Sequence, residues 1–186
     1  TGEFLNYCQK KKWKVVGVEP EKKAAEFAQK NYNLSIKNVS SFFSFEEETF
    51  NVITLWHVLE HVYDLNKYLN QFQKVLKKNG IIMLGLPNCN SHDAKHYKEN
   101  WVAWDLPIHL YHFTKNDIKK LAKKHGFVLE KVFPLVFDSF YISMLSQKKK
   151  GRSKLFGLWR GFVSNLKGKK TGEFSSHIYV LRKNAL

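Results

Sequence analysis

One segment, residues 50–64, constrains the fold of this chain more than any other. An apolar run at residues 50–55 is followed at once by a polar turn at residues 56–64 that contains two histidines and two acids. A short apolar run with this ending is typical of a buried strand. In open α/β sheets, ligands bind beside the carboxyl ends of the strands. The segment therefore predicts a binding or catalytic site just after residue 55.

Strand and helix patterns alternate along the first half of the chain. Strands are expected at residues 13–19, 34–39, 51–56 and 81–86. A helix is expected to begin after Pro20, and a second to begin at Asp64 and close at Lys77–Gly80 with cations and a left-handed cap. This alternation predicts an α/β fold with a doubly wound, Rossmann-like and mostly parallel sheet.

The second half departs from that alternation. Residues 88–113 form a long polar and aromatic connection, which predicts a substrate or lid loop. A helix at residues 118–125 follows, and strands at 127–137 and 176–183 are expected to form an antiparallel hairpin at the sheet edge. Residues 146–173 are a basic insertion between these last two strands. With 186 residues and 44% hydrophobic content, one domain covering residues 1–186 is the expectation.

The net charge of +15 raises the question of a nucleic-acid partner. Only three of the 31 basic residues are arginine, whereas proteins that grip phosphates and base edges favour the arginine fork. Binding of RNA through a lysine-rich face therefore stays an alternative and not the main hypothesis. The two cysteines, Cys8 and Cys89, are too few for a disulfide framework, which fits a reducing cytoplasm.

Residues 148–170 combine basic flanks with an apolar centre that contains a tryptophan. This composition is typical of a helix that lies in a membrane interface. The main interpretation is nevertheless a flexible insertion with a few docked apolar residues, because Gly157 and Gly161 weaken a helix, and the interfacial helix is the alternative. No apolar stretch reaches the roughly 20 residues of a membrane-spanning helix. The expected location is the cytoplasm, with peripheral membrane contact as the alternative.

Three motifs give the chain a resemblance to a known family. They are Val15-Val16-Gly17-Val18-Glu19-Pro20, the block from Phe50 to His61, and Trp104-Asp105-x-Pro-x-His-Leu-x-His-Phe113. Together they resemble the class I S-adenosylmethionine-dependent methyltransferases, above all the small-molecule group similar to the ubiquinone-pathway O-methyltransferases. In that family a glycine-rich turn follows the first strand. This chain opens at Thr1-Gly2-Glu3-Phe4-Leu5, as though inside that turn, so a truncation at the N-terminus is expected.

The resemblance implies S-adenosylmethionine as the cofactor and a set of residues that would bind it. Gly2 would let the backbone approach the methionine part, and Glu19, at the end of a strand, would accept the ribose hydroxyls. The implied cofactor-binding set is Gly2, Glu19, Ser40, Trp56 and His57. Ser40 stands in a region where the family usually has an acid, so an amide or hydroxyl would replace that contact.

The polar turn and the long connection supply the candidate acceptor side. Histidines near neutral pKa are suited to act as general bases, and aromatic rings can stack on a substrate. His109 and His112 are the candidate catalytic residues, and the candidate substrate residues are Trp104, Asp105 and Tyr111. No metal is the main expectation. The alternative is a divalent cation held by His57, Glu60 and His61, because imidazole and carboxylate are good ligands.

These inferences combine into one functional hypothesis with two alternatives. The main hypothesis is an S-adenosylmethionine-dependent methyltransferase that acts on a small-molecule or lipid-like acceptor, at oxygen. Direct displacement of this kind asks the protein for in-line positioning and, in some cases, a base. The alternatives are an RNA methyltransferase and a non-catalytic relative that retains the fold as an interaction module.

Overall fold

The computed structural model describes residues 2–184, which form two compact units that divide between Glu46 and Glu47. Each unit is described by itself. The first contains α1 (Glu3–Lys10), β1 (Gly17–Val18), α2 (Lys22–Tyr32), β2 (Ile36–Lys37) and α3 (Val39–Phe42). Strands β1 and β2 pair in parallel, with Gly17 opposite Ile36. The strands expected at 13–19 and 34–39 are therefore present, but each is paired over only two residues.

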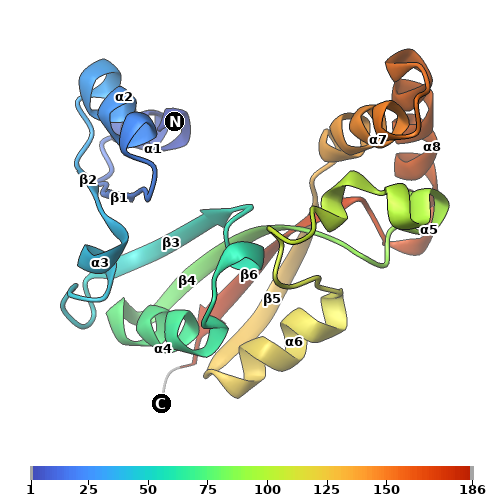
Figure 1. The fold of residues 1–186 in the computed structure, drawn as a ribbon. Helices are drawn as coiled ribbons and strands as arrows, with labels where there is room; N and C mark the ends of the chain where they lie inside the picture. The colour runs from blue at the N-terminus through green and yellow to red at the C-terminus, as the bar shows by residue number, and fades with distance from the viewer. Residues whose placement is uncertain (1, 185–186) are drawn as a thin grey trace. The chain divides into compact units, whose positions relative to one another are not determined.

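The second unit is built on a four-stranded sheet with the order β3-β4-β6-β5 (Figure 1). These strands are β3 (Phe50–Trp56), β4 (Leu76–Pro87), β5 (Phe127–Pro134) and β6 (Ser176–Lys183). Strands β3 and β4 are parallel, and β6 runs antiparallel to both β4 and β5. The expected antiparallel pair at the sheet edge is confirmed, and β6 lies between β4 and β5.

Two helices of the second unit lie where the sequence pattern predicts them, but their last or first residues differ from the predicted ones. They are α4 (Leu65–Val75) and α6 (Lys115–Lys124). Thr114 and Asp117 cap α6 reciprocally, and Gly126 follows it with φ +75°. The expected close of α4 at Lys77–Gly80 is wrong, because β4 begins at Leu76. Backbone carbonyls there accept hydrogen bonds from side chains of β6, so tertiary pairing overrides the local helix-stop signal.

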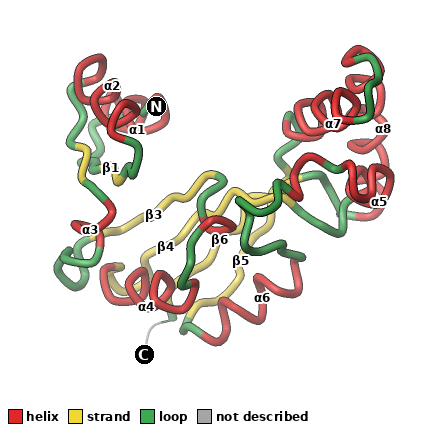
Figure 2. Tube along the Cα trace, viewed as in Figure 1, coloured by secondary structure: helices red, strands yellow, loops and turns green. Residues whose placement is uncertain are grey.

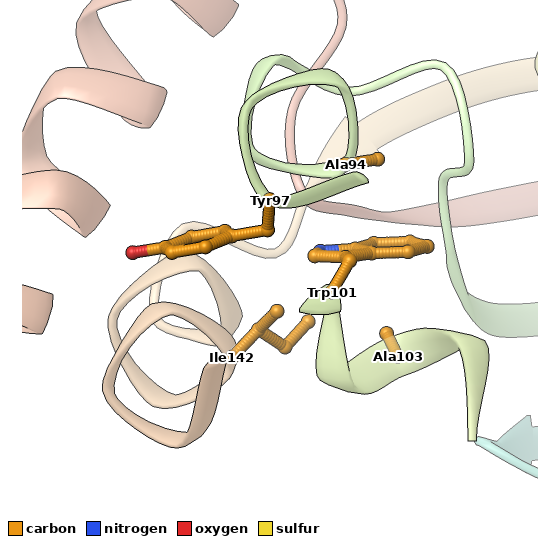
Figure 3. Close-up of a cluster of buried hydrophobic side chains, with 5 residues drawn as sticks. All are labelled: Ala94, Tyr97, Trp101, Ala103 and Ile142. Carbon is orange, nitrogen blue, oxygen red and sulfur yellow. The ribbon is translucent and has the colours of Figure 1, made fainter. Parts of the chain in front are cut away.

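The connection from residue 88 to residue 113 is ordered around a small core of its own. It contains α5 (His92–Tyr97) and two 3₁₀ turns, η2 (Lys98–Asn100) and η3 (Val102–Trp104). Figure 3 shows the core, in which aromatic rings from the connection lie against a side chain of α7 (Asp138–Lys149); its members are Ala94, Tyr97, Trp101, Ala103 and Ile142. The indole N–H of fully buried Trp101 donates to Asp93, with 2.8 Å between the nitrogen and Oδ2. The connection is thus a packed substructure and not an irregular loop.

A helical hairpin stands between β5 and β6, where the sequence places its basic insertion. It consists of α7 (Asp138–Lys149) and α8 (Lys154–Thr171), which lie side by side (Figure 2). The expectation of a flexible insertion is wrong, because Gly157 and Gly161 lie inside α8 and face α7. Strand β5 ends at Pro134 and not at Phe137, because residues 135–137 form the turn into α7. Among the described residues, no helix is both long and apolar enough to cross a membrane.

Candidate functional site

In the first unit, Gly2 and Glu19 line the same hollow. Other residues around it are Leu5, Gly17, Val18, Ala24, Ala28 and Ile36. Gly2 caps α1 with φ +97°, and a Cβ there would lie 2.8 Å from the Cβ of Ala28. Only glycine satisfies both the left-handed backbone and this close approach. The structure therefore brings together the two residues expected at the methionine and ribose ends of a cofactor.

Glu19 follows β1 directly, and its position is fixed from two sides. Its backbone N–H donates to the carbonyl of Lys37, at 3.0 Å, and its Oε1 accepts the backbone N–H of Glu21, at 2.9 Å. Ser40 has a different setting. It is exposed on α3, outside the lining of the hollow, and its hydroxyl donates to Oδ1 of Asn38, which caps α3. The Ser40 hydroxyl thus supports a helix cap, and its cofactor role stays a prediction.

In the second unit, Trp56 and His57 end β3 beside β4. Gly85 makes room for the Trp56 ring, since a Cβ at Gly85 would lie 2.7 Å from Cε3 of Trp56. His57 has φ 52° and donates its backbone N–H to the carbonyl of Gly85, at 2.9 Å. A left-handed histidine directly after a strand is a strained feature that the neighbouring strand holds in place.

The imidazole of His57 lies between two carboxylates. Its Nε2 is 3.1 Å from Oδ2 of Asp138, at the start of α7, and its Nδ1 is 3.4 Å from Oε1 of Glu60. The contact with Asp138 first, and that with Glu60 second, raise the pKa of His57 to about 9 against the opposing effect of burial. His57 is therefore a cation at neutral pH and bridges the end of β3 to α7.

This ion pair predicts a measurable pH dependence. Because the pKa is raised in the folded state, the stabilisation is complete below the ordinary value of 6.5 and is lost as pH rises through about 9. We expect NMR to show His57 titrating near 9, and Asp138→Asn to move its midpoint down. His125, whose pKa burial lowers, is the internal control and should titrate below 6.5 in both proteins. A normal midpoint for His57 would contradict the pairing.

Glu60, His61 and His109 form a second cluster next to this pair. Each offers a ligand atom, and the three atoms lie within 4.8 Å of one another. Glu60 is 1% exposed; its Oε1 lies 3.4 Å from Nδ1 of His57, whereas its Oε2 has no hydrogen-bond donor among the residues that the structure describes. A buried carboxylate in that state is costly unless a cation or a donor reaches it. A carboxylate with two imidazoles is a common ligand set for divalent metals, so these residues fit such an ion.

This arrangement changes the metal alternative drawn from the sequence. His57 pairs with Asp138, and His109 joins Glu60 and His61 in its place. Nδ1 of His109 lies 2.9 Å from the carbonyl of Ala103, a contact that orients the ring and leaves Nε2 as the nitrogen that could bind an ion. Metal-binding histidines commonly hold their second nitrogen in this way. The backbone carbonyl of Glu60 accepts the N–H groups of Leu110 and Tyr111, which brings the two segments together.

His112 lies beside the cluster and shares a pocket with it. The pocket is lined by Glu60, Pro87, Cys89, Trp101, Ala103, His109, Tyr111, His112 and Phe113. Its volume of about 10 Å³ is room for a water molecule or an ion and not for an organic acceptor. Nε2 of His112 is 2.9 Å from the carbonyl of Trp104, so Nδ1 is the atom that could accept a proton.

The candidate substrate residues surround these histidines in three different settings. The indole N–H of Trp104 donates to the carbonyl of Lys98, at 2.6 Å, and its ring meets His112 edge-on. Asp105 is exposed, with Oδ2 3.9 Å from Nε2 of His109. The Tyr111 hydroxyl donates to the carbonyl of Tyr63 at 3.1 Å. These contacts fix the walls around His109 and His112, and the substrate role of the three residues stays a prediction.

Sequence reasoning missed one member of the site, Asp138. It opens a helix whose pattern looks structural, and only its side-chain contact with His57 brings it here. No local signal could have identified it, because the contact joins segments far apart along the chain.

Comparison with known proteins identifies the family. A family model described as a methyltransferase domain matches residues 1–132. The chain is 27% identical over 135 residues to the ubiquinone biosynthesis O-methyltransferase of Pelagibacter ubique (strain HTCC1062), which covers 67% of this chain and 56% of that protein. The chain therefore spans little more than half the length of this curated relative.

Two solved structures have the same fold. One is a SAM-dependent methyltransferase from Methanosarcina mazei, with a TM-score of 0.65, 14% identity, and coverage of 100% of this chain and 89% of that one. The other is a geranyl diphosphate C-methyltransferase from Streptomyces coelicolor A3(2), with a TM-score of 0.64, 13% identity, and coverage of 98% and 67%. With the family match over most of its length and this fold, the chain belongs to the class I S-adenosylmethionine-dependent methyltransferases.

Proposed function

We propose that the protein transfers the methyl group of S-adenosylmethionine to a hydroxyl oxygen of a small-molecule or lipid-like acceptor. The observation that carries this proposal is the grouping of Glu60, His61, His109 and His112 beside the carboxyl ends of β3 and β4. A buried carboxylate and three imidazoles are suited to remove a proton from a hydroxyl group. The O-methyltransferase activity named for the Pelagibacter relative supports the same chemistry.

The cofactor's sulfonium supplies the reactivity, so the protein's part is binding, positioning and proton removal. Gly2 and Glu19, which line one hollow of the first unit, bind the methionine and ribose parts, and a cofactor role for Ser40, Trp56 and His57 stays a prediction. We assign the base to His112, because His109 contributes a ring nitrogen to the cluster with Glu60 and His61. Trp104 holds the His112 ring through its backbone carbonyl and by edge-on contact.

The same cluster is the candidate site for a divalent cation. Glu60, His61 and His109 would hold it, and a bound cation would lower the pKa of an acceptor hydroxyl as a Lewis acid. The observation that favours this site is Oε2 of the buried Glu60 carboxylate, which has no hydrogen-bond donor among the described residues and lies in a cluster with two imidazoles.

Metal binding can be tested without any acceptor. We expect isothermal titration with Mn²⁺ or Zn²⁺ to show one binding site. Glu60→Gln and His109→Ala should each lower its metal affinity by about tenfold or more. His96→Ala, an exposed histidine outside the cluster, is the control and should bind normally. Equal binding by the wild type and Glu60→Gln would remove the cation from the proposal and leave the histidine base in place.

A separate test addresses the cofactor. Replacing Glu19 with Ala should weaken binding of S-adenosylhomocysteine by about 1–3 kcal/mol, the scale of lost hydrogen bonds to a charged acceptor. Isothermal titration measures this directly. Glu26→Ala, on the exposed face of α2, is the matched control and should leave the affinity unchanged. Unchanged affinity in Glu19→Ala would refute the ribose role.

A further inference from the structure

Helix α8 packs against α7 through its smallest residues. Gly157, Gly161, Ser164 and Gly168 are buried along one side of it. A Cβ at Gly157 would lie 2.5 Å from the Cα of Met144, and one at Gly161 would lie 2.7 Å from the Cα of Phe140. The two helices therefore touch backbone to backbone at these points, and no larger residue fits there.

This packing leaves the large apolar residues of α8 on the outside. Leu155, Trp159, Phe162 and Leu166 follow the same spacing as the buried small residues, two positions earlier, which places them on the opposite side of the helix. All four are exposed, with Leu155 at 77% and Trp159 at 54%. We call these four residues the outer stripe of α8. A water-facing helix normally has the reverse arrangement, with its large apolar side chains inward.

The rotation of α8 is fixed, so the outer stripe cannot turn inward. The Ser164 hydroxyl donates to the buried carboxylate of Asp93, at 2.8 Å, and the Asn165 amide donates to the carbonyl of Val136, at 2.9 Å. Turning the helix would break both bonds and drive Trp159 or Phe162 into the backbone of α7, where glycine alone fits. The exposure of the outer stripe is thus built into the hairpin.

The charge around the outer stripe has one sign. Between residues 139 and 171 the chain has no acidic residue, and its basic residues are Lys148, Lys149, Lys150, Arg152, Lys154, Arg160, Lys167, Lys169 and Lys170. The lysines and Arg152 are exposed and stand at the two ends of α8, on either side of the apolar centre. An apolar face with a tryptophan and basic ends complements a surface that is apolar below and anionic above, which describes a bilayer of anionic lipids.

From this geometry we infer that the α7–α8 hairpin docks the protein on an anionic lipid bilayer, with the outer stripe of α8 inserted at the level of the headgroups. The inference does not depend on the identity of the methyl acceptor. The lysines would contact lipid phosphates, while Trp159 and Phe162, whose ring centroids are 6.1 Å apart, would enter the interface together.

Vesicle co-sedimentation tests the apolar part. We expect binding to vesicles of equal parts phosphatidylglycerol and phosphatidylcholine, and the double change Trp159→Ser with Phe162→Ser should weaken it by about tenfold or more, because both side chains lose their apolar burial. Trp13→Ser is the matched control, since Trp13 is 57% exposed and lies in the other unit. Trp159→Phe should retain most of the binding. Equal loss in the Trp13 variant, or none in the double variant, would overturn the inference.

A charge series tests the electrostatic part. Replacing Lys167, Lys169 and Lys170 with Gln should weaken binding to the anionic vesicles, and rising salt should weaken binding of the wild type. The same three-charge change at Lys119, Lys120 and Lys123, exposed on α6, is the control and should have a much smaller effect. The inference that the lipid is anionic would be overturned by equal loss of binding in the two triple variants, or by equal binding of the wild type to pure phosphatidylcholine vesicles. If the protein bound no vesicles and sedimentation analysis showed a dimer through α8, the outer stripe would be a contact with a second copy of the chain, and the lipid inference would be wrong.

Discussion

Replacing His112 with Ala should lower the turnover of methyl transfer by about 10²–10⁴-fold, the usual contribution of a general base. The expectation rests on its half-buried ring, whose Nε2 meets the Trp104 carbonyl, so that Nδ1 is left as the atom that could accept a proton. The measurement is transfer of a labelled methyl group from S-adenosylmethionine to a panel of phenols and prenylated phenols. Cofactor affinity should stay within about twofold, because the base acts on the acceptor proton.

Two further variants make this expectation specific. His109→Ala should affect the binding of divalent cations as well as turnover, since one of its ring nitrogens belongs to the cluster with Glu60 and His61. His96→Ala should change neither. A pH profile separates base loss from misfolding, because removal of a base abolishes the acidic limb of the rate profile while a structural defect lowers the rate at every pH. Undiminished turnover in His112→Ala would eliminate this histidine as the base.

Replacing Trp101 with Ala should destabilise the protein by about 3–5 kcal/mol, the range for loss of a buried tryptophan. Trp101 is fully buried at the centre of the core in Figure 3, and its indole N–H donates to Asp93, which would lose that donor. Asp93 also accepts a hydrogen bond from the Ser164 hydroxyl of α8, so the same change should weaken the packing of α8. Urea unfolding of the purified variant measures the difference in unfolding free energy.

An exposed tryptophan and a milder change at Trp101 supply the contrast for that measurement. Trp13 is 57% exposed, so Trp13→Ala should cost less than about 1 kcal/mol, as surface changes do. Trp101→Phe keeps an aromatic ring but removes the N–H donor, and its loss of unfolding free energy should fall between those of Trp13→Ala and Trp101→Ala. A small cost for Trp101→Ala would show that the connection at residues 88–113 does not depend on this core.

The elements that could be predicted from the sequence are those encoded over a few neighbouring residues. Strand β6 was expected at residues 176–183 and lies there, and the reciprocal cap of Thr114 and Asp117 begins α6 as its residue types require. Glu19 was placed at a strand end from the Val-rich run before it, and it follows β1. Periodicity and caps depend on side chains within one turn, so the local order of residues is sufficient to determine them.

At two positions, contacts with residues far away in the sequence changed the secondary structure that the local sequence pattern favours. The Lys77–Gly80 segment carries a helix-stop pattern, yet it joins β4 because side chains of β6 bind its carbonyls. The glycines of α8 weaken a helix in isolation, yet they permit the close contact with α7 that holds it. In α8 the packing energy therefore exceeds the helix-propensity cost of about 1 kcal/mol per glycine.

The same division applies to the candidate site. By itself the sequence determined which chemical groups follow β3 and lie in the connection, namely His57, Glu60, His61, His109 and His112. Only the tertiary structure decided their partners: His57 faces Asp138, while His109 joins Glu60 and His61. Residue types and strand ends are local properties, whereas the distance between two side chains far apart along the chain depends on how the whole sheet and its insertions pack.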